Sequence, residues 1–68
     1  MQILVNDQHH DVIAPTLAAL LEELGYDGTA RLATALDGSF IAAGRRAAVP
    51  LHEGARVEIL APMQRVRP

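Results

Sequence analysis

The fold of this chain is decided by the stretch TLAALLEELG, residues 16–25. Its four leucines recur at the spacing i, i+3, i+4 and i+7, which places them on one face of a helix. Thr16 has the side chain of a helix N-cap, and Gly25 can adopt the left-handed backbone that ends many helices. A helix of about nine residues is marginal alone in water. The leucine face therefore requires a second layer to cover it.

A first hairpin is expected just before this helix. Residues 2–5 form a short apolar run that ends in a polar turn cluster at residues 6–8, and residues 9–14 are predicted to be the return strand. Alternation sends Ile3 and Val5 to one face of the sheet and Leu4 to the other.

A second hairpin is expected after the helix. Asp37-Gly38 favours a two-residue turn, and it separates a loosely alternating run at residues 31–36 from Ser39-Phe40-Ile41. The Ala-rich residues 42–50 then predict a short irregular or helical turn, and residues 51–54 predict a tight turn.

The clearest strand of the second half covers residues 56–61. The first and last strands are the most apolar, so we expect them side by side, in parallel, at the centre of the sheet. The predicted fold class is therefore α+β, a β-grasp in which a mixed sheet of four or five strands packs on one helix. The strand alternation predicts that Ile3, Val5, Val57 and Ile59 face that helix, with Ala61 on the same strand face as Val57 and Ile59, and that Leu4, Glu58 and Leu60 point away.

Composition limits the classes to which the protein can belong. Its 68 residues make one domain, expected over residues 1–62, with a flexible tail at residues 63–68. The absence of cysteine excludes disulfides and thiolate metal sites. A net charge of −2 argues against nucleic acid as a partner, and no apolar run approaches membrane-spanning length. We expect a cytoplasmic protein with no membrane association.

Several clusters of polar residues are expected to be ordinary surface. His9-His10 would point to opposite faces of a strand, so no metal site is predicted there. Glu22-Glu23 and Glu53 are interpreted as solvated carboxylates, and Arg45-Arg46 as surface arginines. No cofactor is expected from these residues.

Three segments, in this order, resemble the ThiS family, the sulfur carriers of thiamin biosynthesis: MQILVN at residues 1–6, the leucine helix at 16–25, and GARVEILAPMQ at 54–64. The resemblance covers nearly the whole chain. It implies the β-grasp fold that ThiS shares with ubiquitin and with MoaD, the molybdopterin sulfur carrier. It also implies a protein that is not an enzyme.

In such a family the reactive atom is the C-terminus itself. The resemblance implies two partners: an adenylating enzyme of the ThiF type, which activates the terminal carboxylate, and a thiazole synthase of the ThiG type. Family members end in Gly-Gly. Here no Gly-Gly occurs, so we expect adenylation of this sequence to be slower than that of a Gly-Gly version. The tail reads Met63, Gln64, Arg65, Val66, Arg67 and Pro68.

Two leucines are candidates for a docking surface. Alternation sends Leu4 and Leu60 away from the helix, and a monomer has little reason to expose them. We expect them to contact the adenylating enzyme or the thiazole synthase. Two other functions remain open: a β-grasp docking module that carries no sulfur, and a MoaD-like carrier of the molybdopterin pathway.

Overall fold

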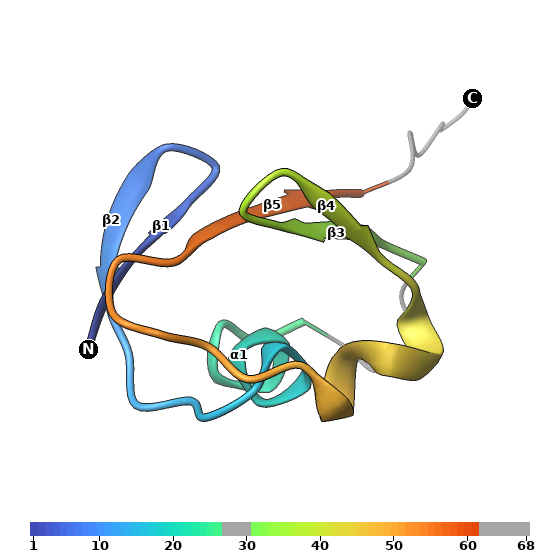
Figure 1. Cartoon of the computed structure of the whole chain (residues 1–68), viewed down its shortest axis with the longest axis horizontal. Coiled ribbons are helices and arrows are strands. Elements are labelled where there is room, and N and C mark those ends of the chain that lie inside the picture. The colour runs from blue at the N-terminus through green and yellow to red at the C-terminus, as the bar shows by residue number, and fades with distance from the viewer. Residues whose placement is uncertain (27–30, 62–68) are drawn as a thin grey trace.

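The protein is known from a computed structural model, which describes residues 1–26 and 31–61. A five-stranded sheet forms one layer and helix α1 lies across one of its faces (Figure 1). The 3-10 helix η1 packs beside α1. In chain order the elements are β1 (Gln2–Val5), β2 (Gln8–Asp11), α1 (Leu17–Glu23), β3 (Ala33–Leu36), β4 (Ser39–Ile41), η1 (Ala43–Ala48) and β5 (Arg56–Leu60).

Helix α1 begins and ends with the predicted caps. The Thr16 side chain accepts a hydrogen bond from the Ala19 amide at 3.2 Å, as an N-cap does. Gly25 has a φ of +91°, and the Tyr26 amide then donates to the Leu21 carbonyl at 2.9 Å. This is the Schellman arrangement, in which a left-handed glycine lets the chain turn back on the last helical turn.

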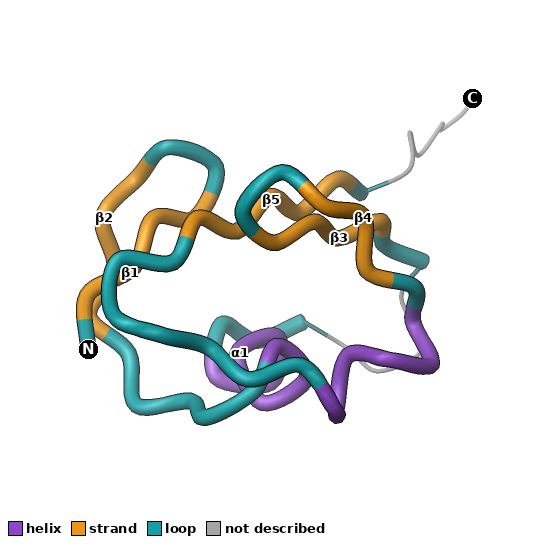
Figure 2. Tube along the Cα trace, viewed as in Figure 1, coloured by secondary structure: helices purple, strands orange, loops and turns teal. Residues whose placement is uncertain are grey.

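The sheet has the order β2-β1-β5-β3-β4 (Figure 2). β1 and β5 are parallel, with Leu4 opposite Arg56 and Val5 opposite Val57, and every other pair is antiparallel. The predicted central parallel pair is therefore confirmed. Because parallel neighbours cannot be joined by a tight turn, the chain between them crosses to the other layer and forms α1 on the way.

The core lies between the sheet and α1, as the alternation predicts. Ile3 and Val57 are buried at the centre of the sheet, opposite Leu17 and Leu20 on the helix. Leu24 was expected to be buried with them, and it is only partly buried, because it is the C-cap residue at the end of the helix. The buried hydrophobic residues are Ile3, Val5, Val12, Ala14, Leu17, Leu20, Leu21, Leu51, Ala55, Val57 and Ile59.

The return strand of the first hairpin differs from its predicted range of 9–14. β2 begins at Gln8, because the turn consists of Asn6 and Asp7 alone, which have φ values of +49° and +68°. A two-residue turn of this kind matches the twist of the strands it joins. β2 ends at Asp11 since the chain then leaves the sheet to reach α1. Val12 and Ala14 fill the side of the core from that loop.

The end of the last strand also differs from its prediction. β5 ends at Leu60 rather than at residue 61, and Ala61 is exposed, unlike Val57 and Ile59. The physical reason is the length of the neighbour, since Leu60 pairs with Ala33, the first residue of β3. The predicted loop at 27–29 and the tail at 63–68 lie outside the described residues.

The middle of the chain folds largely as expected, with one correction. Asp37 and Gly38 form the predicted turn, and the stretch 42–50 contains the helical turn η1. Arg46 is not a free surface arginine, because its Nε donates to the Thr34 hydroxyl at 3.0 Å and its Nη2 to the Leu32 carbonyl at 2.6 Å. The buried Thr34 hydroxyl in turn donates to the Ile41 carbonyl at 2.8 Å. η1 is thereby fastened to the sheet.

Two carboxylates interpreted as solvated surface are exposed, and they also accept hydrogen bonds from the backbone. The Glu23 side chain accepts from the amides of Ile13 and Ala14 at 3.2 and 3.0 Å. The Glu53 side chain accepts from the amide of Gln2 at 3.1 Å. Two of these amides lie in the loop before α1 and the third is at the first residue of β1, and carboxylates satisfy them. Among the described residues, no helix is long and apolar enough to cross a membrane.

Candidate functional site

The predicted reactive tail, residues 63–68, lies outside the described residues, so the candidate site is built from the strand that leads to it. β5 is central, with β1 on one side and β3 on the other. On the β3 side four antiparallel pairs hold it, from Ala33 opposite Leu60 to Leu36 opposite Val57. The base of the tail is therefore a strand paired on both sides.

The β1 side of this strand is completed by a side chain. The Asn6 amide nitrogen donates to the Val57 carbonyl at 2.9 Å, which is the last backbone bond of the parallel ladder. Beyond it the β1 backbone turns away into the hairpin. The Asn6 side chain then takes its place: Oδ1 accepts from the Ile59 amide at 2.9 Å and Nδ2 donates to the Ile59 carbonyl at 3.0 Å. We call this pair of bonds the Asn6 clasp.

The clasp extends the support of β5 by one step toward the tail. A primary amide carries the same donor and acceptor as a peptide group, so it continues the pattern that β1 would have made had it stayed straight. Sequence analysis treated residues 6–8 only as a turn cluster. The feature of the sequence that could have indicated the clasp is an asparagine in the turn, because asparagine tolerates a positive φ and also has an amide side chain.

The two predicted docking leucines lie on the same face of the sheet but do not come together. Leu4 is opposite Arg56 on β5, whereas Leu60 lies four residues further along that strand. At about 3.3 Å per residue they are separated by roughly 13 Å. Leu4 is partly buried, while Leu60 is 71% exposed.

An aromatic residue, Phe40, lies on the same face of the sheet as Leu60, two strands away on β4. Phe40 on β4 is also 71% exposed, and the two side chains border a groove of about 370 Å³ on the face of the sheet opposite α1. We call it the outer groove. Phe40 was not predicted as part of a docking surface. The sequence feature that could have indicated it is the pair of alanines at 33 and 35, whose short side chains leave a hollow beside a large ring. The lining residues are Asn6, Asp7, Ala33, Thr34, Ala35, Phe40, Glu58, Ile59 and Leu60.

An ion pair fastens the second hairpin to the start of β5. His52 Nε2 lies 2.7 Å from Asp37 Oδ2, and His52 Nδ1 lies 3.0 Å from the Glu53 carbonyl oxygen. Both partners are acceptors, so both ring nitrogens donate when the imidazole is charged. The hydrogen bond that His52 donates to Asp37 raises the pKa of His52. The same bond, with a second from the Arg56 amide, lowers the pKa of Asp37.

The described residues offer no metal-binding cluster. In residues 1–26 and 31–61 no three His, Cys, Asp or Glu side chains are grouped to hold an ion. His9 pairs with Leu4 and His10 with Ile3, so the two histidines point to opposite faces of the sheet.

Comparison with known proteins assigns this geometry to a family. The sequence model of the ThiS family matches residues 3–64 of the chain. The chain belongs to the ThiS family. No curated protein matches the chain.

A solved structure shows the same fold. It is the crystal structure of a thiamine biosynthesis protein (ThiS) from Geobacter metallireducens, which is 22% identical in sequence. The match covers 97% of this chain and 100% of the other, with a TM-score of 0.81. The predicted β-grasp is thereby confirmed. The ThiS-family match includes β1, α1, β5 and the first two tail residues, Met63 and Gln64, whereas residues 65–68 lie beyond it.

Proposed function

We propose that this chain is a sulfur carrier of thiamin biosynthesis, which holds sulfur as a thiocarboxylate at the end of its tail. The observation that carries the proposal is the ThiS-family match, because it runs from β1 through β5 and into the tail. The tail is then the position of the reactive terminus. Its residues are Met63, Gln64, Arg65, Val66, Arg67 and Pro68.

The chemistry belongs to a partner enzyme rather than to a side chain of the carrier. The terminal carboxylate attacks the α-phosphorus of ATP, pyrophosphate leaves, and an acyl adenylate forms. A sulfur nucleophile delivered by the partner then displaces AMP and gives the thiocarboxylate. In this proposal an adenylating enzyme of the ThiF type performs the first step. A thiazole synthase of the ThiG type receives the sulfur, and all three act in the cytoplasm without a cofactor bound to the carrier.

The face of the sheet opposite α1 is the proposed docking surface for these partners. Leu60 and Phe40 expose most of their side chains there, and Leu4 lies on the same face at the other end of β5. Exposed apolar side chains grouped beside a groove mark interaction sites. The surface also adjoins the base of the tail, so a partner bound to it would have the tail within reach.

A pair of proteins tests the carrier function. One has the printed sequence, and in the other Gly-Gly follows Gln64 directly. Both are assayed for ATP–pyrophosphate exchange with the same ThiF-type enzyme. We expect faster exchange for the Gly-Gly version, by a factor on the order of 100, because misplacing a reacting atom by about 1 Å has an effect of that size. Glycines pass a narrow channel more readily, whereas Pro68 fixes its own φ.

Intact-mass measurement after addition of a sulfur donor completes the test. A carrier gains the mass of a thiocarboxylate in place of a carboxylate. If the Gly-Gly version neither exchanges pyrophosphate nor gains this mass with any ThiF-type enzyme, the proposal is wrong. Equal rates for the two proteins would show that the enzyme reads the tail of this chain in a different way.

A docking module that never carries sulfur is the second candidate. The observation that favours it is that no Gly-Gly pair occurs among the 68 residues. Such a module would bind the same enzyme tightly and leave its own mass unchanged. A MoaD-like carrier would instead be modified by the adenylating enzyme of the molybdopterin pathway.

A further inference from the structure

The outer groove has a specific arrangement of aromatic and acidic side chains. Ala35 on β3 is opposite Phe40 on β4 and opposite Glu58 on β5, so these three side chains form a row across the same face. Neighbouring strands are about 4.8 Å apart. An aromatic ring and a carboxylate therefore stand roughly 10 Å apart with only a methyl group between them.

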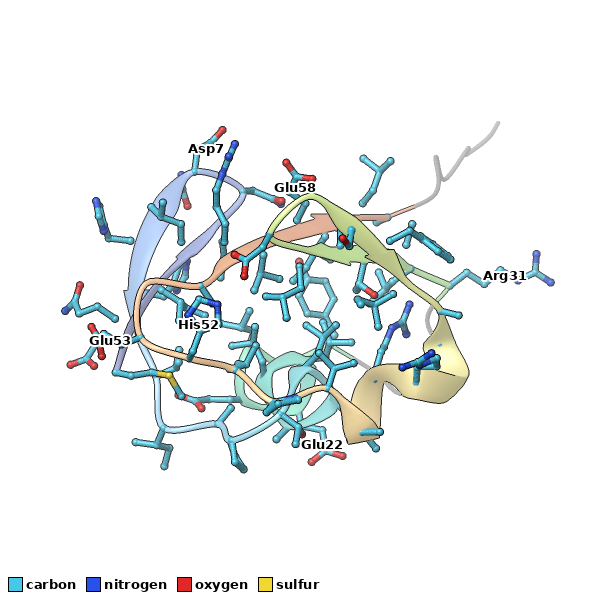
Figure 3. All side chains as sticks on the ribbon, viewed as in Figure 1. Asp7, Glu22, Arg31, His52, Glu53 and Glu58 are labelled. Atoms are coloured by element: carbon cyan, nitrogen blue, oxygen red, sulfur yellow. The ribbon has the colours of Figure 1, made fainter. Side chains whose placement is uncertain are left out.

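The charge of this groove is negative. Among the described residues, Glu58 has no ion-pair partner, and Asp7 has only Arg56 at 3.9 Å. Both carboxylates line the groove. Figure 3 shows Asp7 and Glu58 on the side of the sheet away from α1, with Glu22 on the opposite side of the molecule. Phe40 and Leu60 make the rest of the rim apolar.

An arginine side chain complements such a row. Its stem is aliphatic and suits the alanine floor, and its planar guanidinium stacks on an aromatic ring. The edge of the guanidinium presents a fork of N–H donors that fits a carboxylate. A lysine has a compact charge and cannot use the ring and the carboxylate in the same way.

We propose that the outer groove binds an apolar segment of the adenylating enzyme that inserts one arginine between Phe40 and Glu58. This inference rests on the proposed function, since it names the partner feature that docks there. Leu60 contacts the apolar residues of that segment. Asp7 adds a second carboxylate at the end of the groove and attracts the same positive charge.

Charge reversal at two carboxylates tests the inference with the full chain. Glu58→Arg and Glu22→Arg change the net charge equally, but Glu22 is an exposed residue of α1 in the opposite layer. Affinity for a ThiF-type enzyme is measured by calorimetry. We expect Glu58→Arg to weaken binding by about 10-fold or more, because the new arginine would repel the arginine that the partner inserts. Glu22→Arg should change it by less than about 2-fold, as a distant charge does.

Equal losses for both variants would show general electrostatic attraction and overturn the inference, as would no loss for either. Phe40→Leu, which keeps an apolar side chain but removes the ring, should also weaken binding. Self-association of the chain that Glu58→Arg abolishes would assign the groove to a second copy instead. The same comparison is repeated in a chain in which Arg65 and Arg67 are both replaced by glutamine. If Glu58→Arg then no longer weakens binding, the occupant of the groove is the chain's own tail. Either result overturns the inference.

A probe without the enzyme separates this inference from the proposed function. The ¹⁵N-labelled chain is titrated with acetyl-leucyl-arginine amide and with its neutral citrulline counterpart. We expect the amide signals of Ala35, Phe40 and Glu58 to shift with the arginine peptide alone, and the shifts to disappear in Glu58→Gln. If these shifts occur but the enzyme does not bind at all, the groove recognises arginine, and both the carrier proposal and the assignment of the groove to the adenylating enzyme are wrong. If neither peptide shifts them, the arginine site is wrong.

Discussion

The two faces of β5 have opposite properties although they belong to the same five residues. On the inner face Val57 and Ile59 are buried against α1. On the outer face Glu58 and Leu60 are exposed and border a groove. The side chains of the inner face therefore determine the fold, whereas those of the outer face are free to determine which partner binds. Substitutions on the two faces should therefore affect folding and binding separately.

The largest effect is expected on the inner side. Leu20 on α1 is fully buried, so Leu20→Ala should lower the free energy of unfolding by about 2–5 kcal/mol through lost burial and the cavity left behind. For so small a domain this is a large part of the total stability. Chemical denaturation measures it. Unchanged stability would mean that the leucine face does not pack on the sheet.

The Asn6 clasp lies between the two faces, at the edge of the central ladder. Asn6→Gly removes both side-chain bonds to Ile59 and still allows the positive φ of this turn. We expect a loss of about 1–3 kcal/mol, because backbone groups of β5 lose their partners. Asp7→Gly, a change of the neighbouring turn residue with its own positive φ, is the matched control and should cost less. Hydrogen exchange at the Ile59 amide should accelerate only in Asn6→Gly.

A pH-dependent effect is expected from the pair of His52 and Asp37. The raised pKa of His52 means that its contribution is fully present below the ordinary value of 6.5 and is lost as the pH rises through the raised value. The lowered pKa of Asp37 means that its part is present above 3.8 and lost as the pH falls through the lowered value. His52→Gln should therefore lower the thermal midpoint near pH 5.5 and leave it unchanged near pH 9.

The same thermal scans on His9→Gln provide the control, since His9 is an exposed histidine with no ion pair among the described residues. A difference between wild type and His52→Gln that persists at pH 9 would show that the stabilisation does not depend on the positive charge of His52, because a neutral imidazole can still donate a hydrogen bond to Asp37.

The smallest effect on folding is expected on the outer face. Phe40→Ser and Leu60→Ser change exposed side chains, so each should alter the free energy of unfolding by no more than about 0.5 kcal/mol. Binding to the adenylating enzyme should nevertheless weaken. Should either variant unfold as readily as Leu20→Ala, the outer face would be part of the core and the comparison between the two faces would fail.

Most of the fold was accessible from the sequence because it depends on periodicity and on local caps. The leucine spacing, the Thr16 cap, the left-handed Gly25 and the Asp37-Gly38 turn each follow from short-range chemistry. The parallel central pair followed from the two most apolar strands. The strand ends were less predictable, because β2 stops where the chain must leave for the helix, which is a tertiary requirement.

The features that sequence analysis missed all depend on which residues meet in space. The Asn6 clasp joins residues 53 positions apart in the chain. Arg46 reaches back to Thr34, and Glu23 reaches loop amides. Phe40 becomes a candidate contact residue only because the antiparallel register places Ala35 opposite it and Glu58 on the far side of Ala35. A linear pattern shows the types of these residues but not their pairings.

The support of β5 also has a mechanical consequence. A force that draws the residues after Ala61 into another protein acts along β5, which lies between β1 and β3. The hydrogen bonds of both ladders and of the Asn6 clasp run across that force, so they are loaded in shear and share the load rather than breaking one after another. An edge strand would peel away bond by bond under the same load. The domain can therefore act as a rigid handle from which its terminal segment is pulled without being unravelled.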